Sequence, residues 1–406
     1  MKKFVYLLAV ISLLFSCGEE KQPNLLSGTW RGVMVVQDGN ELPFTFNLKK
    51  GQAGYLMEVY NAAEVLAIDE ISTNKDSIII RMPVFDGYIA GTFTEDSMQG
   101  EFIKEDLERR VPFRASHGDP DRFKGDSSAE VQVAGIWETY FSKGTKDEYQ
   151  AKGIFEQEGN KVTGTFRTTT GDYRYLEGIV QGDSLKLSTF DGAHVFLFLA
   201  RITDSTMTGT FFSGNHFQEP FVGKRNEAYE LPDETSLTYL KEGYEGVDFS
   251  FPDENGKLIS PEDPEYRDKV VILQIMGTWC PNCMDETRFL VDYLKDHGEE
   301  DLKVISLAFE YARTEEAAFK GIRRLKDRLG VPYPIVLAQY GSSDKKSANE
   351  KLPMLNHVLS YPTTVFIDRD GKVRKIHTGF NGPATGEKYT AFKEEFHGFV
   401  QELLAE

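Results

Sequence analysis

The feature that most constrains the fold of this chain is a pair of cysteines placed where an apolar run meets a helical pattern. The run Val270–Met276 leads into Gly-Thr-Trp-Cys-Pro-Asn-Cys at residues 277–283, and an amphipathic stretch follows at residues 287–297. A near-continuous apolar run is typical of a parallel strand covered on both faces. We therefore predict that a buried strand delivers Cys280 and Cys283 to the first turn of a helix, at the strand end where open α/β sheets place their sites.

This position favours thiolate chemistry. Unpaired backbone N–H groups and the positive end of the helix dipole stabilise a thiolate, so Cys280 is the predicted nucleophile. Pro281 suits the first helical turn, because its φ is fixed and its missing N–H costs little there. The spacing of three puts both sulfurs on one face, close enough for a disulfide, with Cys280 at the exposed end and Cys283 further inside. Cys280 would attack a substrate disulfide, and Cys283 would resolve the mixed disulfide.

Two alternatives compete with this interpretation of the cysteine pair. Half of a structural zinc site would need two further ligands, but the sequence has no second Cys-x-x-Cys or His-x-x-x-His pair, and its seven histidines are scattered. A purely structural disulfide would suit an oxidising compartment. A Cys-x-x-Cys that opens a helix in a βαβ pattern is typical of a redox centre. We therefore predict thiol–disulfide chemistry with no metal and no other cofactor.

Two motifs give residues 244–406 a resemblance to a known family. Thr-Trp-Cys-Pro-Asn-Cys at 278–283 and Ser-Tyr-Pro-Thr-Thr-Val-Phe-Ile-Asp at 360–368 resemble the two signatures of TlpA/ResA-type thioredoxin-like disulfide reductases. The resemblance implies that Pro362 is cis and stands opposite the cysteines, where the neighbouring backbone pairs with the substrate. We place Trp279, Tyr361 and Pro362 in the substrate-binding site on this basis.

The same resemblance implicates Glu286, three residues after Cys283, in proton handling. Gln274 stands where thioredoxins carry a buried Asp, so no carboxylate at that position can accept the proton of Cys283. Glu286 is therefore the candidate general base, and a surface glutamate that merely favours the helix dipole is the alternative. The dipeptide Pro281-Asn282 departs from the Cys-x-Pro-Cys order common in the family. The redox potential is commonly tuned at that dipeptide, so we leave it open.

The order of elements after residue 244 indicates an α/β domain. A hairpin is predicted at 247–257, because its Asn-Gly pair favours the positive φ of a tight turn. The βαβαβ-ββ-α order that follows implies a mixed sheet with helices on both faces. We predict strands at 270–276, 303–309, 334–338, 363–368 and 373–377, helices at 284–297, 314–329 and 387–404, and a polar, partly helical segment at 341–357.

The N-terminus indicates export. Lys2 and Lys3 precede an apolar run at residues 4–15 that is too short to span a bilayer, so residues 1–16 are predicted to be a signal peptide. Leu-Phe-Ser-Cys at its end resembles the lipobox of bacterial lipoproteins, which implies cleavage before Cys17 and lipid on its sulfur. Plain secretion is the alternative. With a lipid anchor and a tether at 17–26, the protein would sit on a bacterial membrane and face the periplasm or the cell exterior.

Composition agrees with this placement and excludes one class of partner. The chain has only three cysteines, Cys17 and the redox pair. No further cysteine is present that could form a structural disulfide or a wrong disulfide with the active site. A net charge of −18 argues against nucleic acid, and it leaves attachment to anionic membranes to the lipid. The expected partners are thiols and disulfides of exported proteins and a membrane electron donor of the thiol type.

Residues 27–225 show short alternating strands, and they repeat. Gly-Thr-Trp at 28–30 matches Gly-Ile-Trp at 135–137, a period of 107 residues, and residues 96–102 align with 204–211. We predict a tandem duplication of one all-β unit, each copy with about eight short strands able to close into a small barrel or sandwich. The first Trp of each copy is predicted to be a core aromatic. The boundaries are unit 1 at 27–115, a linker at 116–130, unit 2 at 131–225, a linker at 226–243 and the thioredoxin-like domain at 244–406.

Other functions compete with the leading interpretation, which is an anchored thiol–disulfide oxidoreductase. A reductase is the favoured direction, and the sequence leaves the oxidant direction open, because the direction depends on the potentials of partners that it does not name. Thiol peroxidases share the thioredoxin fold and place one reactive Cys at the same helix start, but their Pro-x-x-x-Thr-x-x-Cys signature is missing. Alternatively, the β units could make the protein chiefly a ligand- or partner-binding lipoprotein with an accessory redox domain.

Overall fold

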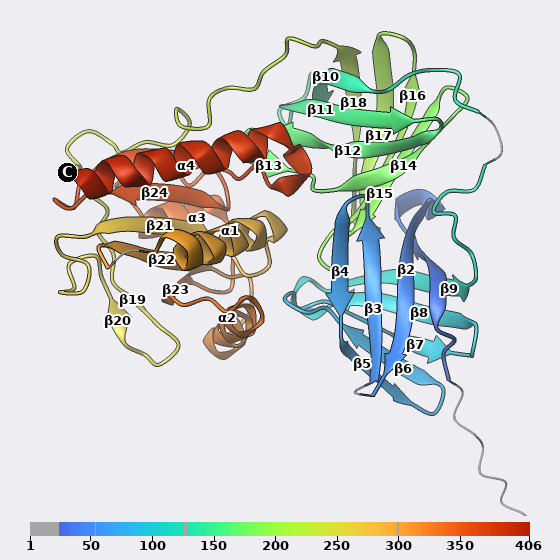
Figure 1. The fold of residues 1–406 in the computed structure, drawn as a ribbon, viewed down its shortest axis with the longest axis horizontal. Helices are drawn as coiled ribbons and strands as arrows, with labels where there is room; N and C mark the ends of the chain where they lie inside the picture. Colours follow the sequence, from blue (N-terminus) through green and yellow to red (C-terminus); the bar gives the residue numbers. More distant parts are fainter. Residues whose placement is uncertain (1–23, 53, 126–127, 299) are drawn as a thin grey trace, which may run out of the picture.

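The computed structural model describes residues 24–52, 54–125, 128–298 and 300–406, which form two β units and an α/β domain (Figure 1). The predicted signal peptide and Cys17 lie outside the described residues. Within those four ranges, no helix is long and apolar enough to cross a membrane.

β unit 1 is a single antiparallel sheet in which the first and last strands are neighbours, β1 beside β9. The sheet order is β4-β3-β2-β1-β9-β8-β7-β6-β5. Its strands are β1 (Gly28–Val35), β2 (Glu41–Gly51), β3 (Gly54–Asn61), β4 (Glu64–Ile68), β5 (Glu70–Asn74), β6 (Ser77–Arg81), β7 (Tyr88–Phe93), β8 (Ser97–Lys104) and β9 (Arg109–His117).

β unit 2 has the same neighbour relation between its first and last strands, β10 and β18, and an additional β11–β12 pairing closes its sheet into a ring. Its strands are β10 (Gly135–Phe141), β11 (Tyr149–Glu158), β12 (Lys161–Thr168), β13 (Gly171–Asp172), β14 (Leu176–Gln181), β15 (Ser184–Phe190), β16 (Val195–Ile202), β17 (Thr206–Ser213) and β18 (Phe217–Arg225). Aromatic side chains fill the ring, with Phe141, Phe166 and Phe198 all buried.

The all-β character predicted for residues 27–225 is confirmed, although each sheet has nine strands rather than about eight. The repeat is visible in detail at the two predicted core tryptophans. Trp30 and Trp137 are both buried, and the indole N–H of each donates to a carbonyl four residues earlier, Leu26 O at 3.0 Å and Val133 O at 2.8 Å. Burial of a large ring with its one polar group satisfied explains why each unit is built around this residue.

The α/β domain holds a five-stranded sheet of order β23-β22-β21-β24-β25. β21, β22 and β23 are parallel, and β24 runs antiparallel to both of its neighbours, β21 and β25. All seven residues of the central strand β21 are buried, as its apolar run predicts. The elements are β19 (Phe251–Pro252), β20 (Leu258–Ile259), β21 (Val270–Met276), α1 (Pro281–His297), β22 (Leu302–Phe309), α2 (Glu315–Leu329), β23 (Ile335–Gln339), α3 (Lys345–Lys351), β24 (Thr363–Ile367), β25 (Val373–Thr378) and α4 (Glu387–Ala405).

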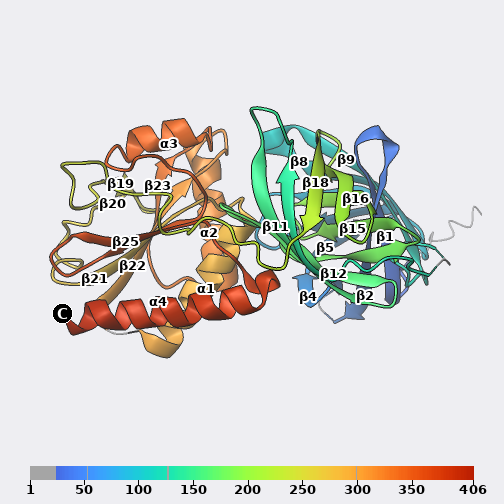
Figure 2. The same cartoon turned by 90° about the horizontal axis from the view of Figure 1, so that it is seen from above.

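Helices α1 and α4 pack together on one side of this sheet, and α3 lies on the other side (Figure 2). The contact between α1 and α4 is aromatic, because the Phe289 ring lies 5.3 Å from Phe392 and 4.9 Å from Phe396, measured between ring centroids. The contact fixes the direction of α1, and therefore of the helix start that carries the cysteines.

The two connecting segments are packed against the units that they join. In the first, the buried guanidinium of Arg122 donates to Tyr60 O in β unit 1 and, at 3.2 Å, to Ser188 O in β unit 2. In the second, the Glu234 carboxylate lies 2.5 Å from the Lys388 ammonium of α4, and the Glu234 carbonyl accepts a 3.0 Å hydrogen bond from Thr378 N. These contacts hold the three parts in a defined arrangement.

Candidate active site

The cysteine pair lies at the start of α1, as the sequence predicts. Cys280 is the N-cap residue and Pro281 follows at the first helical position. Cys280 and Cys283 are joined in a disulfide, with their Cα atoms 5.2 Å apart. The backbone N–H of Cys283 points at the Cys280 Sγ at 3.2 Å. Reduction would thus leave a Cys280 thiolate with a hydrogen-bond donor already in place and the helix dipole behind it.

The second predicted motif stands opposite the disulfide. The Tyr361–Pro362 peptide bond is cis, and Tyr361 O lies 3.5 Å from the Cys280 Sγ. The Trp279 indole N–H donates to Phe309 O at 2.9 Å, and its ring meets the Tyr361 ring edge-on at 5.6 Å. The structure therefore brings together Trp279, Tyr361 and Pro362, the three residues assigned to substrate binding, beside the cysteines.

Cys280 is the more accessible cysteine of the pair, but it is not at an exposed end: the residue is only 6% exposed. The cover comes from the β12–β13 hairpin of β unit 2. Ser360 Oγ donates to Thr170 O at 2.7 Å, and Asn282 Nδ2 donates to Asp172 O at 3.1 Å. The approach is so close that a Cβ on Gly171 would come within 2.7 Å of Asn282 Nδ2. The expectation of an exposed Cys280 is wrong because a hairpin that is distant in the sequence covers part of this face.

A single arginine joins all three parts of the molecule next to the active site. The buried Arg174 guanidinium forms ion pairs with Glu64 of β unit 1, with Asp191 of its own unit at 3.1 Å, and with Asp285 of α1. It also donates to Pro281 O at 3.3 Å. Burial opposes its charge, but the surrounding carboxylates outweigh this and raise the pKa of Arg174. No motif marks Arg174 in the sequence, since it is one basic residue in a turn.

A buried polar network lies behind Cys283. Gln274 Nε2 donates to Glu286 Oε2 at 2.9 Å and lies 3.4 Å from Cys283 O, while Thr364 Oγ1 donates to Glu286 Oε1 at 2.6 Å. Glu286 is 1% exposed, so the alternative of a surface glutamate is wrong. Burial raises the pKa of Glu286 despite these hydrogen bonds. A carboxyl group that titrates above its ordinary range is suited to exchanging protons near neutrality.

The structure adds a second buried acid that sequence reasoning missed. Glu310 follows β22, and its carboxylate accepts from Thr278 N and Thr278 Oγ1, both at 2.7 Å. Burial raises the pKa of Glu310 to about 7. It therefore holds the backbone two residues before Cys280. Its position after a strand was the only available signal in the sequence.

A cleft of about 350 Å³ opens in front of the disulfide, and we call it the Cys280 cleft. Its walls come from two parts of the molecule. The α/β domain supplies Cys280, Trp279 and Tyr361. β unit 2 supplies four ring side chains, Tyr149, Tyr173, His194 and Phe196, and four smaller residues at 168 and 170–172. A substrate disulfide that reaches Cys280 must therefore contact both parts.

Comparison with known proteins identifies the C-terminal part. The Redoxin family profile matches residues 241–391. The thioredoxin-like protein YneN of Bacillus subtilis is 30% identical over 140 residues, which are 34% of this chain and 73% of YneN. The thiol-disulfide oxidoreductase ResA of Halalkalibacterium halodurans is 30% identical over 142 residues, 34% of this chain and 68% of ResA.

Among solved structures, a thiol-disulfide oxidoreductase from Bacteroides fragilis aligns with 37% of this chain and 99% of its own, at 17% identity and a TM-score of 0.28. The identity to YneN and ResA over most of their length confirms the resemblance drawn from the two motifs. The chain belongs to the thioredoxin-like thiol–disulfide oxidoreductases of the ResA type, and it is a thiol–disulfide oxidoreductase.

Proposed function

We propose that this protein is a membrane-anchored reductase that exchanges disulfides of exported proteins through Cys280 and Cys283. The observation that carries the proposal is the cysteine pair at the start of α1, facing the cis Tyr361–Pro362 bond across the Cys280 cleft. β unit 2 belongs to this function as part of the substrate surface, because it supplies the opposite wall of the cleft.

The proposed reaction transfers two electrons to the substrate. The Cys280 thiolate attacks one sulfur of the substrate disulfide, the substrate S–S bond breaks, and one substrate thiolate leaves. The Cys283 thiolate then attacks the Cys280 Sγ, breaking the mixed disulfide and releasing the second substrate thiolate. The protein ends as the Cys280–Cys283 disulfide, which is the form of the structure. A membrane donor of the thiol type would restore the dithiol.

Glu286 is proposed as the general base that takes the proton of Cys283 before this second attack. It lies one helical turn beyond Cys283, within the network formed by Gln274. We expect Glu286→Gln to lower turnover by roughly 10²-fold, the usual contribution of a positioned base, with the largest loss below the pKa of a free thiol. Steady-state rates across pH 5 to 9 measure this effect, and Glu402→Gln on the exposed side of α4 is the matched control.

The same substitution should move stability in the opposite direction. Because burial raises the folded-state pKa of Glu286, the unfolded chain loses this proton first as the pH rises, and the wild type loses stability above the ordinary pKa of glutamate. A glutamine cannot ionise, so the free energy of unfolding should shift in favour of Glu286→Gln between pH 5 and pH 8.

Unchanged turnover of Glu286→Gln at every pH would contradict the role of Glu286 as a base.

Anchoring and direction can be tested together with Cys17→Ser, which removes the proposed lipid attachment. We expect the wild type in the membrane fraction with Cys280 and Cys283 as thiols, and the variant in the soluble fraction with the pair shifted to the disulfide. Fractionation of cells followed by alkylation of free thiols measures both. Recovery of the wild type in the soluble fraction would refute the anchor, and a wild-type pair held as disulfide would refute the reductase direction.

A further inference from the structure

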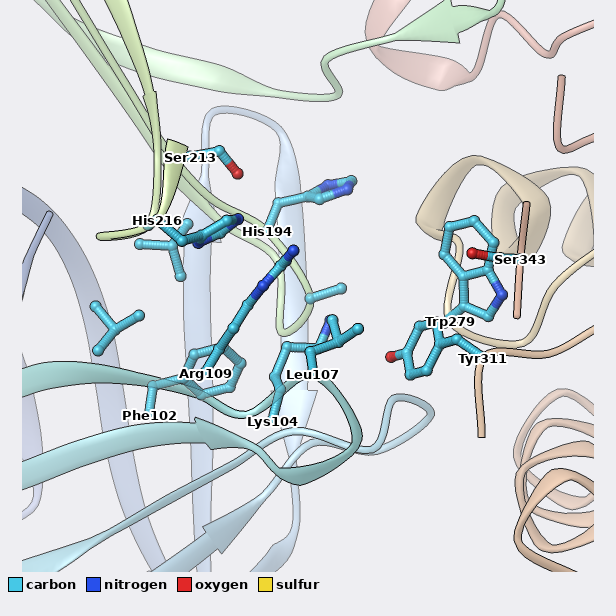
Figure 3. Close-up of a pocket in the computed structure, with 14 residues that line it drawn as sticks. Phe102, Lys104, Leu107, Arg109, His194, Ser213, His216, Trp279, Tyr311 and Ser343 are labelled. Atoms are coloured by element: carbon cyan, nitrogen blue, oxygen red, sulfur yellow. The ribbon is translucent and has the colours of Figure 1, made fainter. Parts of the chain in front are cut away.

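A second cavity, of about 240 Å³, lies beside the Cys280 cleft where all three parts of the molecule meet. We call it the basic pocket. Figure 3 shows the guanidinium of Arg109 reaching into it, with His194, His216 and Ser213 beside that group and Trp279 and Tyr311 across from it. Lys104 lines the same cavity from β unit 1 and is only 8% exposed.

The positive charges in this pocket form no direct ion pair within the part of the chain that the structure describes. Among the described residues, no ion pair joins Lys104 or Arg109 to a carboxylate. The two carboxylates whose charge acts on Lys104, Asp86 and Asp191, are engaged elsewhere. Asp86 accepts from the Tyr311 hydroxyl at 2.9 Å, and Asp191 is held by Arg174 at 3.1 Å and by His194 at 3.0 Å. Unpaired charges are costly to bury, so the arrangement is what a site for an external anion requires.

The electrostatics of the pocket agree with an unfilled anion site. Burial lowers the pKa of both Lys104 and Arg109. Desolvation and the positive charges of Arg109 and Lys104 lower the pKa of His216 to about 4, so His216 is neutral near pH 7. A bound anion would favour the charged form of each group. Such a local positive field stands out in a chain of net charge −18.

The basic pocket and the Cys280 cleft share one boundary. His194 and Trp279 line both cavities, and Trp279 directly precedes Cys280 in the chain. To reach Arg109, a substrate whose disulfide sits at Cys280 has to extend past Trp279. The volume of the pocket is below the ~300–1,000 Å³ of sites that enclose whole small ligands, so it suits one side chain or end group.

We infer that the basic pocket binds a carboxylate of the substrate through Arg109 and Lys104, so that the protein selects disulfides flanked by acidic groups. The inference rests on the proposed exchange at Cys280 and adds the substrate class to it. A carboxylate fits the guanidinium fork of Arg109 with charge-assisted hydrogen bonds, and the low exposure of Lys104 limits screening by solvent. The carboxylate can come from an acidic segment of a protein or from a small disulfide such as glutathione disulfide.

The test compares matched substrates on the full chain in its reduced form. One peptide disulfide carries Glu beside the cysteine, and its counterpart carries Gln. The small-molecule pair is glutathione disulfide and the derivative in which both glycine carboxylates are ethyl esters, so that it carries no net charge near pH 7. We expect kcat/KM for the carboxylate member of at least one pair to exceed that of its neutral counterpart about tenfold, as one charge-assisted contact provides. Preference within the peptide pair assigns a protein segment, and preference within the glutathione pair assigns a small disulfide.

The variants locate the preference in the pocket. In the double variant Lys104→Gln with Arg109→Gln, the ratio of kcat/KM for the two members should fall toward one. Lys75→Gln, which removes one positive charge at the exposed β5–β6 turn, is the control for each single replacement and should keep the wild-type ratio. Should the double variant not fold, Arg109→Gln alone carries the test, and in the wild type added salt should slow only the carboxylate member.

The outcomes separate the two proposals. Equal kcat/KM for charged and neutral members in the wild type would overturn the basic pocket as a substrate site while leaving exchange at Cys280 intact. A preference that survives in the folded double variant would overturn it as well. Failure of the reduced wild type to exchange with any of the four substrates would overturn the proposed function, and this inference with it.

Discussion

Replacement of Cys280 by Ser is expected to abolish disulfide exchange, lowering the rate by ~10³-fold or more, as loss of a catalytic nucleophile does. Cys283→Ser should behave differently. It keeps the nucleophile but cannot resolve the mixed disulfide, so the covalent complex with substrate should accumulate. Turnover of a peptide disulfide and non-reducing electrophoresis measure the two effects.

Cys17→Ser is the matched control for these variants, because it makes the same chemical change at the third cysteine of the chain and leaves the redox pair in place. Its turnover in detergent solution should equal that of the wild type. Turnover retained by Cys280→Ser, or mixed disulfides trapped through Cys283 in that variant, would contradict the assignment of Cys280 as the attacking residue.

Arg174→Met is expected to destabilise the protein by about 3–5 kcal/mol, because it leaves the carboxylates of Glu64, Asp191 and Asp285 buried without their shared cation. The loss of stability should be larger at pH 8 than at pH 5. At low pH the three carboxylates can take up protons, and this lowers the free-energy cost of burying them without a cation. Denaturant unfolding at the two pH values measures this loss.

The appropriate comparison is Arg201→Met in the same β unit. Arg201 forms an ion pair with Asp183, but its side chain is 73% exposed, so removing it should change stability little. Disulfide exchange should also suffer in Arg174→Met alone, because Arg174 holds Pro281 and Asp285 at the first turn of α1. Equal unfolding free energies for the two variants would show that the buried network does not hold the three parts together.

Much of the fold follows from local patterns in the sequence. The apolar run predicts β21 to the residue, because a strand buried on both faces is apolar at all but one of its positions, Gln274. The helix after it begins at Pro281, which confirms the prediction that Pro281 lies in the first turn and extends the predicted range 284–297 by three residues, since Cys280 itself caps the helix. The Gly-x-Trp repeat predicts two related β units, because both copies bury the same ring with the same hydrogen bond.

The cysteine pair and its place at a helix start were therefore determined by the sequence alone, and the resemblance of two motifs to a known family placed Tyr361 and Pro362 beside it. Only the tertiary structure decided how that centre is reached. The hairpin over Cys280, the junction at Arg174 and the basic pocket beside Trp279 all join residues roughly a hundred or more positions apart. Periodicity reports which face of one element is buried, but it carries no information about which distant element covers that face. Contacts between separately folded parts depend on their packing, and that is why Cys280, exposed by its local pattern, is buried in the protein.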